Sequence, residues 1–541
     1  MITVNSPSLF KADTHKWIFL VGLSTIAFAL PWSVWLMSVG QFILAGNWLL
    51  EGQYRAKIVR YWKNKAAVAF SMVFLVFLIT LLYSANTDSG LGLIRILLPL
   101  LVLTFLVASS DHQLGYDKAL VVLLIFCASV ILTTKLGFLS HLIEPTTDFR
   151  QLSPFISHIR LGLMIVLSAF LIPWLFYEFI IRRDNIKNLG NWVVPASGFI
   201  TIMCVGWLIF FLSRMQPLSA ILALLVVMGF LAFYLLINAN KRLPAIILGF
   251  LAIAIIASSA ITTLKLYRLV SLEIPVDLAQ LPTHTSRGNP YHHMPEIKER
   301  ENGHLVYIMI SDTELREAWN YSSELEFDGY DQAGQLLRFT LYRYMTSLGL
   351  TKDKDGFEKL SESDIRAIEG GTANHLYAQW PGLIIRVHQT LWEIEMSRKG
   401  AIPEGHTMGQ RLEYWNAAWL AFLDKPLLGW GLGDVEEAKD YGFKRSESLL
   451  SEEYRLRPHN QWLSFLLYFG IVGTIFVIGL ISYTIAKTKS YTALPFIVFF
   501  LIFLVSTLSD DTFETQAGLT FFAFFFVFFN FLFPKGKQDT K

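Results

Sequence analysis

The sequence predicts an all-α polytopic membrane protein with about 12 transmembrane helices and a large, mostly helical external domain between helices 9 and 10. Three observations support this. Of the 541 residues, 53% are hydrophobic and 16% are charged, whereas soluble domains carry roughly 25% charged residues. Apolar runs recur along the chain, and one long hydrophilic segment interrupts them. A soluble or disordered chain is therefore excluded, and a net charge of +2 argues against a nucleic-acid partner.

Apolar runs mark the predicted spans, because a transmembrane helix needs roughly 20 mostly apolar residues. Twelve runs fit: 17–30, 32–50, 66–84, 91–109, 118–135, 155–181, 191–212, 217–237, 243–264, 460–484, 491–508 and 518–533. The first two are nearly continuous and break at Pro31-Trp32. Residues 1–30 show no small-residue cleavage site after the apolar run, so we predict an uncleaved first span.

The distribution of lysine and arginine predicts the orientation. With the N-terminus in the cytoplasm, the cytoplasmic segments hold 18 of these residues, and the short external loops hold 3, namely Lys135, Arg150 and Arg214. This bias predicts that both termini are cytoplasmic.

Residues 265–457 form the predicted external domain. Residues 1–264, with helices 1–9, precede it, and residues 458–541, with helices 10–12 and a cytoplasmic tail, follow it. The domain holds 22 basic and 30 acidic residues. Four segments of the domain have helical patterns: 333–348, 361–368, 375–398 and 407–422. The second begins with a capping box at Ser361 and stops at Gly370-Gly371, and the third is broken at Pro381. The fourth begins with a capping box of Thr407 and Gln410. Since many transporters have two matching halves, this asymmetric layout disfavours a carrier but leaves it open.

Three residues are candidates for chemistry on the external side. Arg214 lies in a short turn between two spans, where it either snorkels to the interface or contacts an anion. Arg411 follows a predicted helix start, which favours phosphate, although it can equally pair with an acid. His459 opens the tenth predicted span, where it is either a polar helix-entry residue held by local hydrogen bonds or a general base. The helix N-terminus and the cations Arg455 and Arg457 are expected to lower its pKa and keep it neutral.

Other polar groups have weaker signals. His158 and Arg160 lie in the outer half of the sixth span, where a polar group is costly unless it faces a cavity or a substrate. Asp510, Asp511 and Glu514 form either a solvated turn or a cluster that orients an acceptor or an arginine. The glycine-rich segment 429–434 lacks a βαβ context, so we predict a tight turn there.

Two segments show a family resemblance. Residues 411–434 read RLEYWNAAWLAFLDKPLLGWGLGD, and residues 458–473 read PHNQWLSFLLYFGIVG. Together with Ser213-Arg214 and RQLSPFISHIR at 150–160, they resemble the O-antigen ligase and polymerase family of bacterial envelope glycosyltransferases. The insert 265–405 is similar to that of Bacteroidetes-type members. One departure is Met215-Gln216-Pro217, which replaces the small residues of the family after Ser-Arg.

The resemblance implies a metal-independent enzyme without a cofactor, in the bacterial inner membrane. Its donor would be a glycan on undecaprenyl pyrophosphate, and its acceptor would be a hydroxyl of lipid A–core. Alternatively, the acceptor would be a growing polymer or a protein hydroxyl. The site would be periplasmic. The functional arginines of the family map onto Arg214 and Arg411, and its functional histidine maps onto His459. The candidate substrate-binding residues are Arg150, His158, Arg160, Asn460, Asp511 and Glu514.

Overall fold

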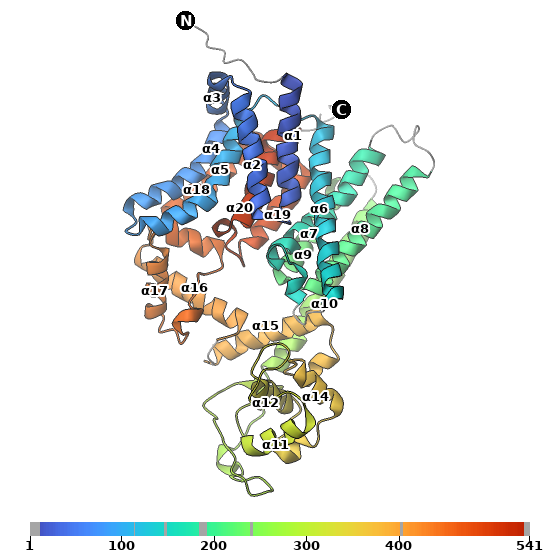
Figure 1. Ribbon diagram of the computed structural model, residues 1–541, viewed down its shortest axis with the longest axis vertical. Coiled ribbons are helices and arrows are strands. Elements are labelled where there is room, and N and C mark those ends of the chain that lie inside the picture. The colour runs from blue at the N-terminus through green and yellow to red at the C-terminus, as the bar shows by residue number, and fades with distance from the viewer. Residues whose placement is uncertain are drawn as a thin grey trace.

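The computed structural model describes residues 11–112, 114–144, 149–182, 192–238, 242–400 and 404–534. It is 73% helical, which confirms the all-α class. Figure 1 shows one helical bundle with a smaller helical domain at one end, in which α11, α12 and α14 lie furthest from the bundle. The helices α15 and α16 lie between these two parts, and α17 lies beside α16 next to the bundle.

The bundle helices correspond one to one with the twelve predicted runs. They are α1 (Ala12–Ala29), α2 (Val34–Leu50), α4 (Lys65–Thr80), α5 (Thr87–Ser109), α6 (Tyr116–Ile143), α7 (His158–Phe176), α8 (Val193–Met215), α9 (Leu218–Asn238), α10 (Arg242–Val270), α18 (Gln461–Thr488), α19 (Leu494–Ser506) and α20 (Gln516–Val527). Among the described residues, eight helices are long and apolar enough to cross a membrane, whereas α2, α19 and α20 are apolar but shorter. The chain is thus a multi-pass membrane protein, and the count of twelve spans stays a prediction.

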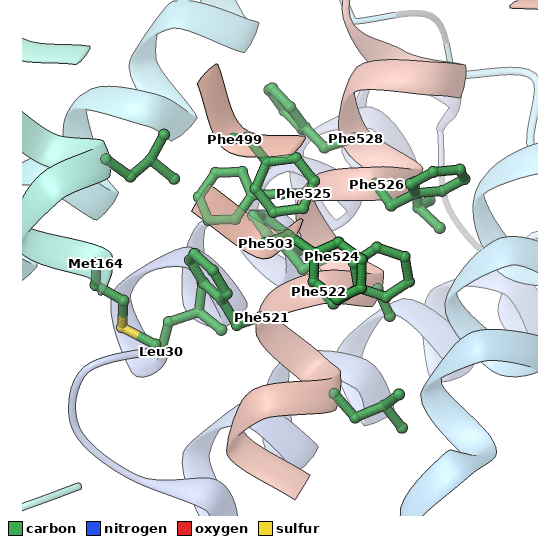
Figure 2. Close-up of a cluster of buried hydrophobic side chains, with 14 of the residues drawn as sticks. Leu30, Met164, Phe499, Phe503, Phe521, Phe522, Phe524, Phe525, Phe526 and Phe528 are labelled. Atoms are coloured by element: carbon green, nitrogen blue, oxygen red, sulfur yellow. The ribbon is translucent and has the colours of Figure 1, made fainter. Parts of the chain in front are cut away.

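The bundle core is rich in phenylalanine, and α20 lies at its centre. Every residue of α20 from Ala517 to Val527 is buried, as expected for a helix that is apolar on all sides. Its rings stack on those of its neighbours: the centroids of Phe503 and Phe522 are 4.1 Å apart, and those of Phe70 and Phe526 are 4.2 Å apart. Figure 2 shows this cluster. Aromatic pairs in such arrangements add about 0.5–1.5 kcal/mol each beyond their buried area, so α20 is firmly held.

A small polar cluster closes the end of the bundle away from the external domain. The predicted cytoplasmic loop after α2 contains the helix α3 (Tyr54–Lys63), which Figure 1 shows at that end. Lys57 of α3 is buried; its Nζ atom lies 2.9 Å from Glu51 Oε2 and donates to the Trp48 carbonyl oxygen. His112 Nε2 contacts Glu51 Oε1 at 3.1 Å. The Glu51 carboxylate therefore joins α2, α3 and the segment before α6.

The external domain contains α11 (Asp312–Ser322), α12 (Leu337–Ser347), α13 (Lys354–Phe357), α14 (Glu362–Glu369), α15 (Gly382–Arg398), α16 (Thr407–Asp424), α17 (Val435–Arg445) and the antiparallel strands β1 (Arg300–Glu301) and β2 (His304–Leu305). The predicted capping box at Ser361 and the break at Pro381 are confirmed. Arg343 of α12 pairs with the fully buried Glu301 at 2.6 Å and lies over the Trp392 ring. These contacts fix α15 against the rest of the domain.

A loop from the external domain runs along a break in α18. Phe469 and Gly470 leave the helical conformation there, and Trp430 N donates to the Leu467 carbonyl oxygen at 2.7 Å. Gly470 has φ 59°, and an added Cβ would lie 2.4 Å from the Leu427 backbone, so only glycine fits this close approach. The segment 429–434 is accordingly a loop between α16 and α17, in agreement with the predicted turn.

Candidate active site

A cavity of about 540 Å³ lies where the bundle meets the external domain. On the bundle side its walls come from η2 (Phe149–Leu152), the start of α7 and the turn between α8 and α9. The opposite walls come from α15, the start of α16 and two turns of the external domain. Three predicted site residues line it, namely Arg150, His158 and Arg411. Other polar groups in its walls are Gln216, Ser219, Gln335, Arg386, Gln389, Thr390, Glu393 and Thr407.

Arg411 presents its guanidinium group to this cavity from the second turn of α16. Among the described residues, no side chain or carbonyl forms a hydrogen bond or an ion pair with it. Burial lowers the pKa of Arg411, while the nearby carboxylates of Asp510 and Asp511 act in the opposite direction. A largely enclosed cation without a direct partner is costly unless a ligand supplies negative charge. Arg411 is therefore well suited to bind an anion bidentately.

The N-terminus of α16 is occupied by an acidic side chain of α15. Met408 N donates to Glu393 Oε2 at 2.5 Å, and His406 at the N-cap position forms no side-chain cap. The predicted capping box of Thr407 and Gln410 is therefore wrong, and the Met408 N–H group is not free for an external anion. Burial raises the pKa of Glu393, although this hydrogen bond and nearby arginines oppose the effect.

His459 lies in a turn directly before α18 and is held by groups on both sides. Its Nδ1 atom is 3.2 Å from Asp511 Oδ2. Trp415 Nε1 of α16 donates to the Pro458 carbonyl oxygen at 2.8 Å, and the Tyr414 ring lies 6.1 Å from the imidazole. His459 has φ 47°, an uncommon conformation for a residue with a side chain. The turn therefore points the imidazole in one defined direction.

The pKa of His459 is shifted opposite to the expected direction. The hydrogen bond with Asp511 raises the pKa of His459 above its usual range; burial and the charge of Arg411 lower it but do not prevail. Arg457, a cation expected to lower this pKa, is paired with Glu436 at 2.8 Å and with Glu514 at 3.1 Å. The prediction of a lowered pKa is therefore wrong, because the Asp511 carboxylate, from the loop after α19, is hydrogen-bonded to the imidazole.

The same loop places two carboxylates at the end of the bundle. Asp511 is buried and accepts a hydrogen bond from Ser464 Oγ of α18 at 3.0 Å, in addition to its contact with His459. Asp510 pairs with the buried Arg160 of α7 at 3.0 Å. Burial raises the pKa of Asp510, while Arg160 acts to lower it. The cluster thus orients an arginine and a histidine, and the alternative of a solvated turn is wrong for Asp511.

Comparison with known families identifies the segment that carries Arg411 and His459. The sequence model of the O-antigen ligase family matches residues 376–478. Residues 376–478 are thus similar to the O-antigen ligase family, and we call this segment the ligase domain. The domain runs through α15, α16 and α17 into α18, so it supplies both the guanidinium of Arg411 and the imidazole of His459. A search of curated proteins finds no match for the chain.

Outside the ligase domain, Glu514 forms a second polar contact with it. Arg457 Nη1 lies 3.1 Å from Glu514 Oε2, and the Tyr468 hydroxyl donates to the other carboxylate oxygen. Burial raises the pKa of Glu514. Asn460 caps α18 by accepting from Trp462 N at 3.0 Å and Leu463 N at 3.2 Å, and its Nδ2 atom donates to the Leu508 carbonyl oxygen. These two side chains therefore use their polar atoms on protein groups.

Of the three basic site residues predicted in or near α7 and α8, two line the cavity and the third, Arg214, does not. Arg150 and His158 line the cavity opposite the ligase domain. Arg214 is exposed at the end of α8, outside the lining, and its guanidinium group lies 4.7 Å from the centre of the Phe149 ring. Since Phe149 lines the cavity, Arg214 lies directly behind that wall.

Several site residues were missed by the sequence analysis. Arg386 and Glu393 of α15 line the cavity, and Ser464 and Tyr468 of α18 bond to Asp511 and Glu514. Arg386 and Glu393 lie outside the segments that carry the family resemblance, and Ser464 and Tyr468 lie within 458–473 but were not singled out there. The one available signal was helical spacing: residues 382, 386, 389 and 393 follow each other at intervals of three or four and so share one face of α15.

Proposed function

We propose that this chain is an inverting glycosyltransferase of the O-antigen ligase type. It moves a glycan from undecaprenyl pyrophosphate to a hydroxyl group of lipid A–core, without a metal ion or cofactor. One observation carries the proposal: Arg411 of the ligase domain, whose guanidinium group has no hydrogen-bond or ion-pair partner in the described part of the chain, lies close to a histidine that is hydrogen-bonded to a carboxylate. The first group suits a phosphate leaving group, and the pair suits removal of a proton from a hydroxyl group.

The imidazole of His459 is the proposed general base. Its Nδ1 atom faces Asp511, which leaves Nε2 to accept the proton of the acceptor hydroxyl. As that proton moves to Nε2, the hydroxyl oxygen forms a bond to the anomeric carbon, and the bond from that carbon to the pyrophosphate oxygen breaks. Attack opposite the leaving group inverts the anomeric centre. Asp511 then stabilises the imidazolium until the proton passes to water.

Negative charge develops on the departing pyrophosphate, and Arg411 is the proposed group that stabilises it. Arg150 and His158 line the same cavity, and we assign them contacts with the glycan or the pyrophosphate. Arg214 is exposed behind the cavity wall, where it meets the pyrophosphate as the donor arrives from the membrane.

Four further predicted residues act through protein contacts in this proposal. Arg160 holds Asp510, and Asp511 holds His459. Asn460 caps the start of α18, and Glu514 pairs with Arg457. They keep the base and the anion site in register, which matters because small displacements of reacting groups reduce rates strongly.

The site faces the periplasm of the bacterial inner membrane in this proposal, and both termini are cytoplasmic. The excess of lysine and arginine in the predicted cytoplasmic segments supports this orientation. A lipid-linked donor then enters from the outer leaflet, and the cavity lies between the bundle and the external domain, where the lipid and aqueous phases meet.

Reconstitution tests the proposal directly. The purified chain, placed in liposomes with a defined undecaprenyl-pyrophosphate glycan, is offered lipid A–core, a second copy of the donor, or a protein with free hydroxyl groups. Mass spectrometry then identifies the product. Transfer to lipid A–core supports the proposal, while transfer to the donor or the protein indicates a polymerase or a protein transferase of the same family. Passage of the donor across the bilayer without any new glycosidic bond would indicate a carrier.

Two substitutions test the residue assignments. His459→Ala is expected to reduce kcat by about 10²–10⁴-fold, the usual contribution of a general base. Arg411→Ala is expected to reduce kcat by about 10²–10³-fold, as for loss of one group that stabilises transition-state charge. His284→Ala, at an exposed position of the external domain, is the matched control and should keep wild-type turnover. Wild-type turnover in either test variant contradicts that assignment.

A further inference from the structure

A second guanidinium group faces the cavity from α15. This helix begins at Gly382, where an added Cβ would lie 2.2 Å from Gln216 Nε2 in the turn between α8 and α9. The first turn of α15 is thus in close contact with the bundle. Arg386 lies one turn further along the same face, and it lines the cavity together with Gln389 and Glu393.

Arg386 has no direct partner among the described residues, since no carboxylate or carbonyl forms an ion pair or a hydrogen bond with its guanidinium group. Arg398 at the end of the same helix is different, because it lies 3.4 Å from Glu395 and is largely exposed. The acid nearest to Arg386 in the described lining is Glu393, and its carboxylate already accepts from Met408 N.

Arg386 and Arg411 lie close enough for their charges to interact. The charge of Arg386 acts to lower the pKa of Arg411, although burial and the opposing carboxylates of Asp510 and Asp511 have larger effects. Two like charges that share a cavity repel each other, and this repulsion is relieved when an anion binds between them. Arg386 and Arg411 therefore line one cavity as two like charges that an anion can bridge.

We propose that Arg386 is a second guanidinium ligand of the pyrophosphate group, opposite Arg411. This inference rests on the proposed function and adds to it a residue that no motif of the sequence identified. A pyrophosphate offers two phosphate groups, and each can accept two parallel hydrogen bonds from one guanidinium fork. Arg386 then binds the donor in its ground state and holds the pyrophosphate product.

The fold does not depend on Arg386, so its substitution is a clean test. Other residues anchor α15: Trp392 Nε1 donates to the Arg300 carbonyl oxygen at 2.7 Å, and the Tyr377 hydroxyl lies 3.0 Å from His388 Nδ1. Among the described residues, no hydrogen bond or ion pair is lost with the guanidinium group of Arg386, and its repulsion toward Arg411 is opposed by its attraction to Glu393. We therefore expect Arg386→Gln to melt close to the temperature of the wild type.

Binding is measured by isothermal titration calorimetry on the full chain in detergent, with inorganic pyrophosphate and with farnesyl pyrophosphate as probes. Arg386→Gln is expected to weaken binding about tenfold or more, as for loss of a charge-assisted bidentate contact. Arg386→Lys keeps the charge but not the fork, so an intermediate loss is expected. Arg398→Gln is the matched control on the same helix and should bind both probes as the wild type does.

The two probes separate the possible sources of the ligand. An equal loss for both assigns Arg386 to the pyrophosphate group itself, and a loss for farnesyl pyrophosphate alone assigns it to the lipid-linked donor. Unchanged binding by Arg386→Gln, an equal loss in Arg398→Gln, or no binding of either probe to the wild type overturns the proposal. If the wild type binds both probes and Arg386→Gln does not, yet no glycan is ever transferred, the proposed function fails and the assignment of Arg386 stands.

Discussion

The polar cluster at the far end of the bundle gives a stability prediction whose size follows from the structure. Burial acts to raise the pKa of Glu51, but the contacts with His112 and Lys57 outweigh it and lower the pKa from its ordinary value of 4.5 to about 2. One pH unit corresponds to about 1.36 kcal/mol. The ionised carboxylate therefore stabilises the folded state by about 3 kcal/mol at neutral pH.

Glu51→Gln removes this contribution and leaves Lys57 buried without its ionic partner. Burial already lowers the pKa of Lys57, so the ammonium group does not recover the loss. Since breaking a buried pair by removal of one partner costs about 3–5 kcal/mol, we expect the free energy of unfolding to fall by about 3 kcal/mol. Because the folded-state pKa is depressed, the stabilisation is complete above pH 4.5 and is lost as the pH falls toward 2.

The assay is equilibrium unfolding in detergent, followed by tryptophan fluorescence between pH 7 and pH 2. Glu362→Gln is the matched control, because its ion pair with Arg366 is exposed and exposed pairs contribute little. Wild-type protein should lose more stability than Glu51→Gln between pH 4.5 and pH 2. Equal free energies of unfolding at pH 7, or parallel pH profiles below 4.5, would refute the reasoning.

Further predictions concern the site and the break in α18. Asp511→Asn replaces the carboxylate that raises the pKa of His459 by a neutral amide, so the acidic limb of the kcat/KM profile should move to lower pH while the plateau falls; an unmoved limb contradicts the base assignment. Asp510→Asn leaves Arg160 buried without its ion-pair partner and should lower the free energy of unfolding by about 3–5 kcal/mol in a denaturant titration, whereas unchanged stability shows that the pair is unimportant. Gly470→Ala should lower the melting temperature, because its Cβ meets backbone atoms, and wild-type melting contradicts the close approach.

The sequence predicted the bundle well because hydropathy and length are sufficient to mark a helix that lies in lipid. The break at Pro31-Trp32 and the break at Pro381 also followed from local chemistry, since proline restricts the backbone regardless of tertiary contacts. The helix α3 was missed because its basic residues suggested a solvated loop, whereas Lys57 is inside the bundle. Its burial depends on Glu51, and local sequence patterns do not show such pairings.

Arg411 and His459 were predicted as site residues because they lie in a motif, and their roles in catalysis stay predictions. The structure places both in the ligase domain near Asp511. The direction of the His459 pKa shift was wrong because the deciding carboxylate comes from a distant loop. Glu393, which occupies the start of α16, was missed because helical spacing shows which residues share a face of α15 but not which helix that face contacts.

The position of Asp511 has a consequence for how the protein becomes active during synthesis. The family segment ends at residue 478, yet the carboxylate that orients His459 follows α19 and precedes α20. A nascent chain released before residue 510 carries the whole family segment and lacks the group that aligns its base. In the proposed mechanism, glycosyl transfer therefore requires synthesis to continue past Asp511. A truncated product that ends before Asp511 is then inert toward the donor.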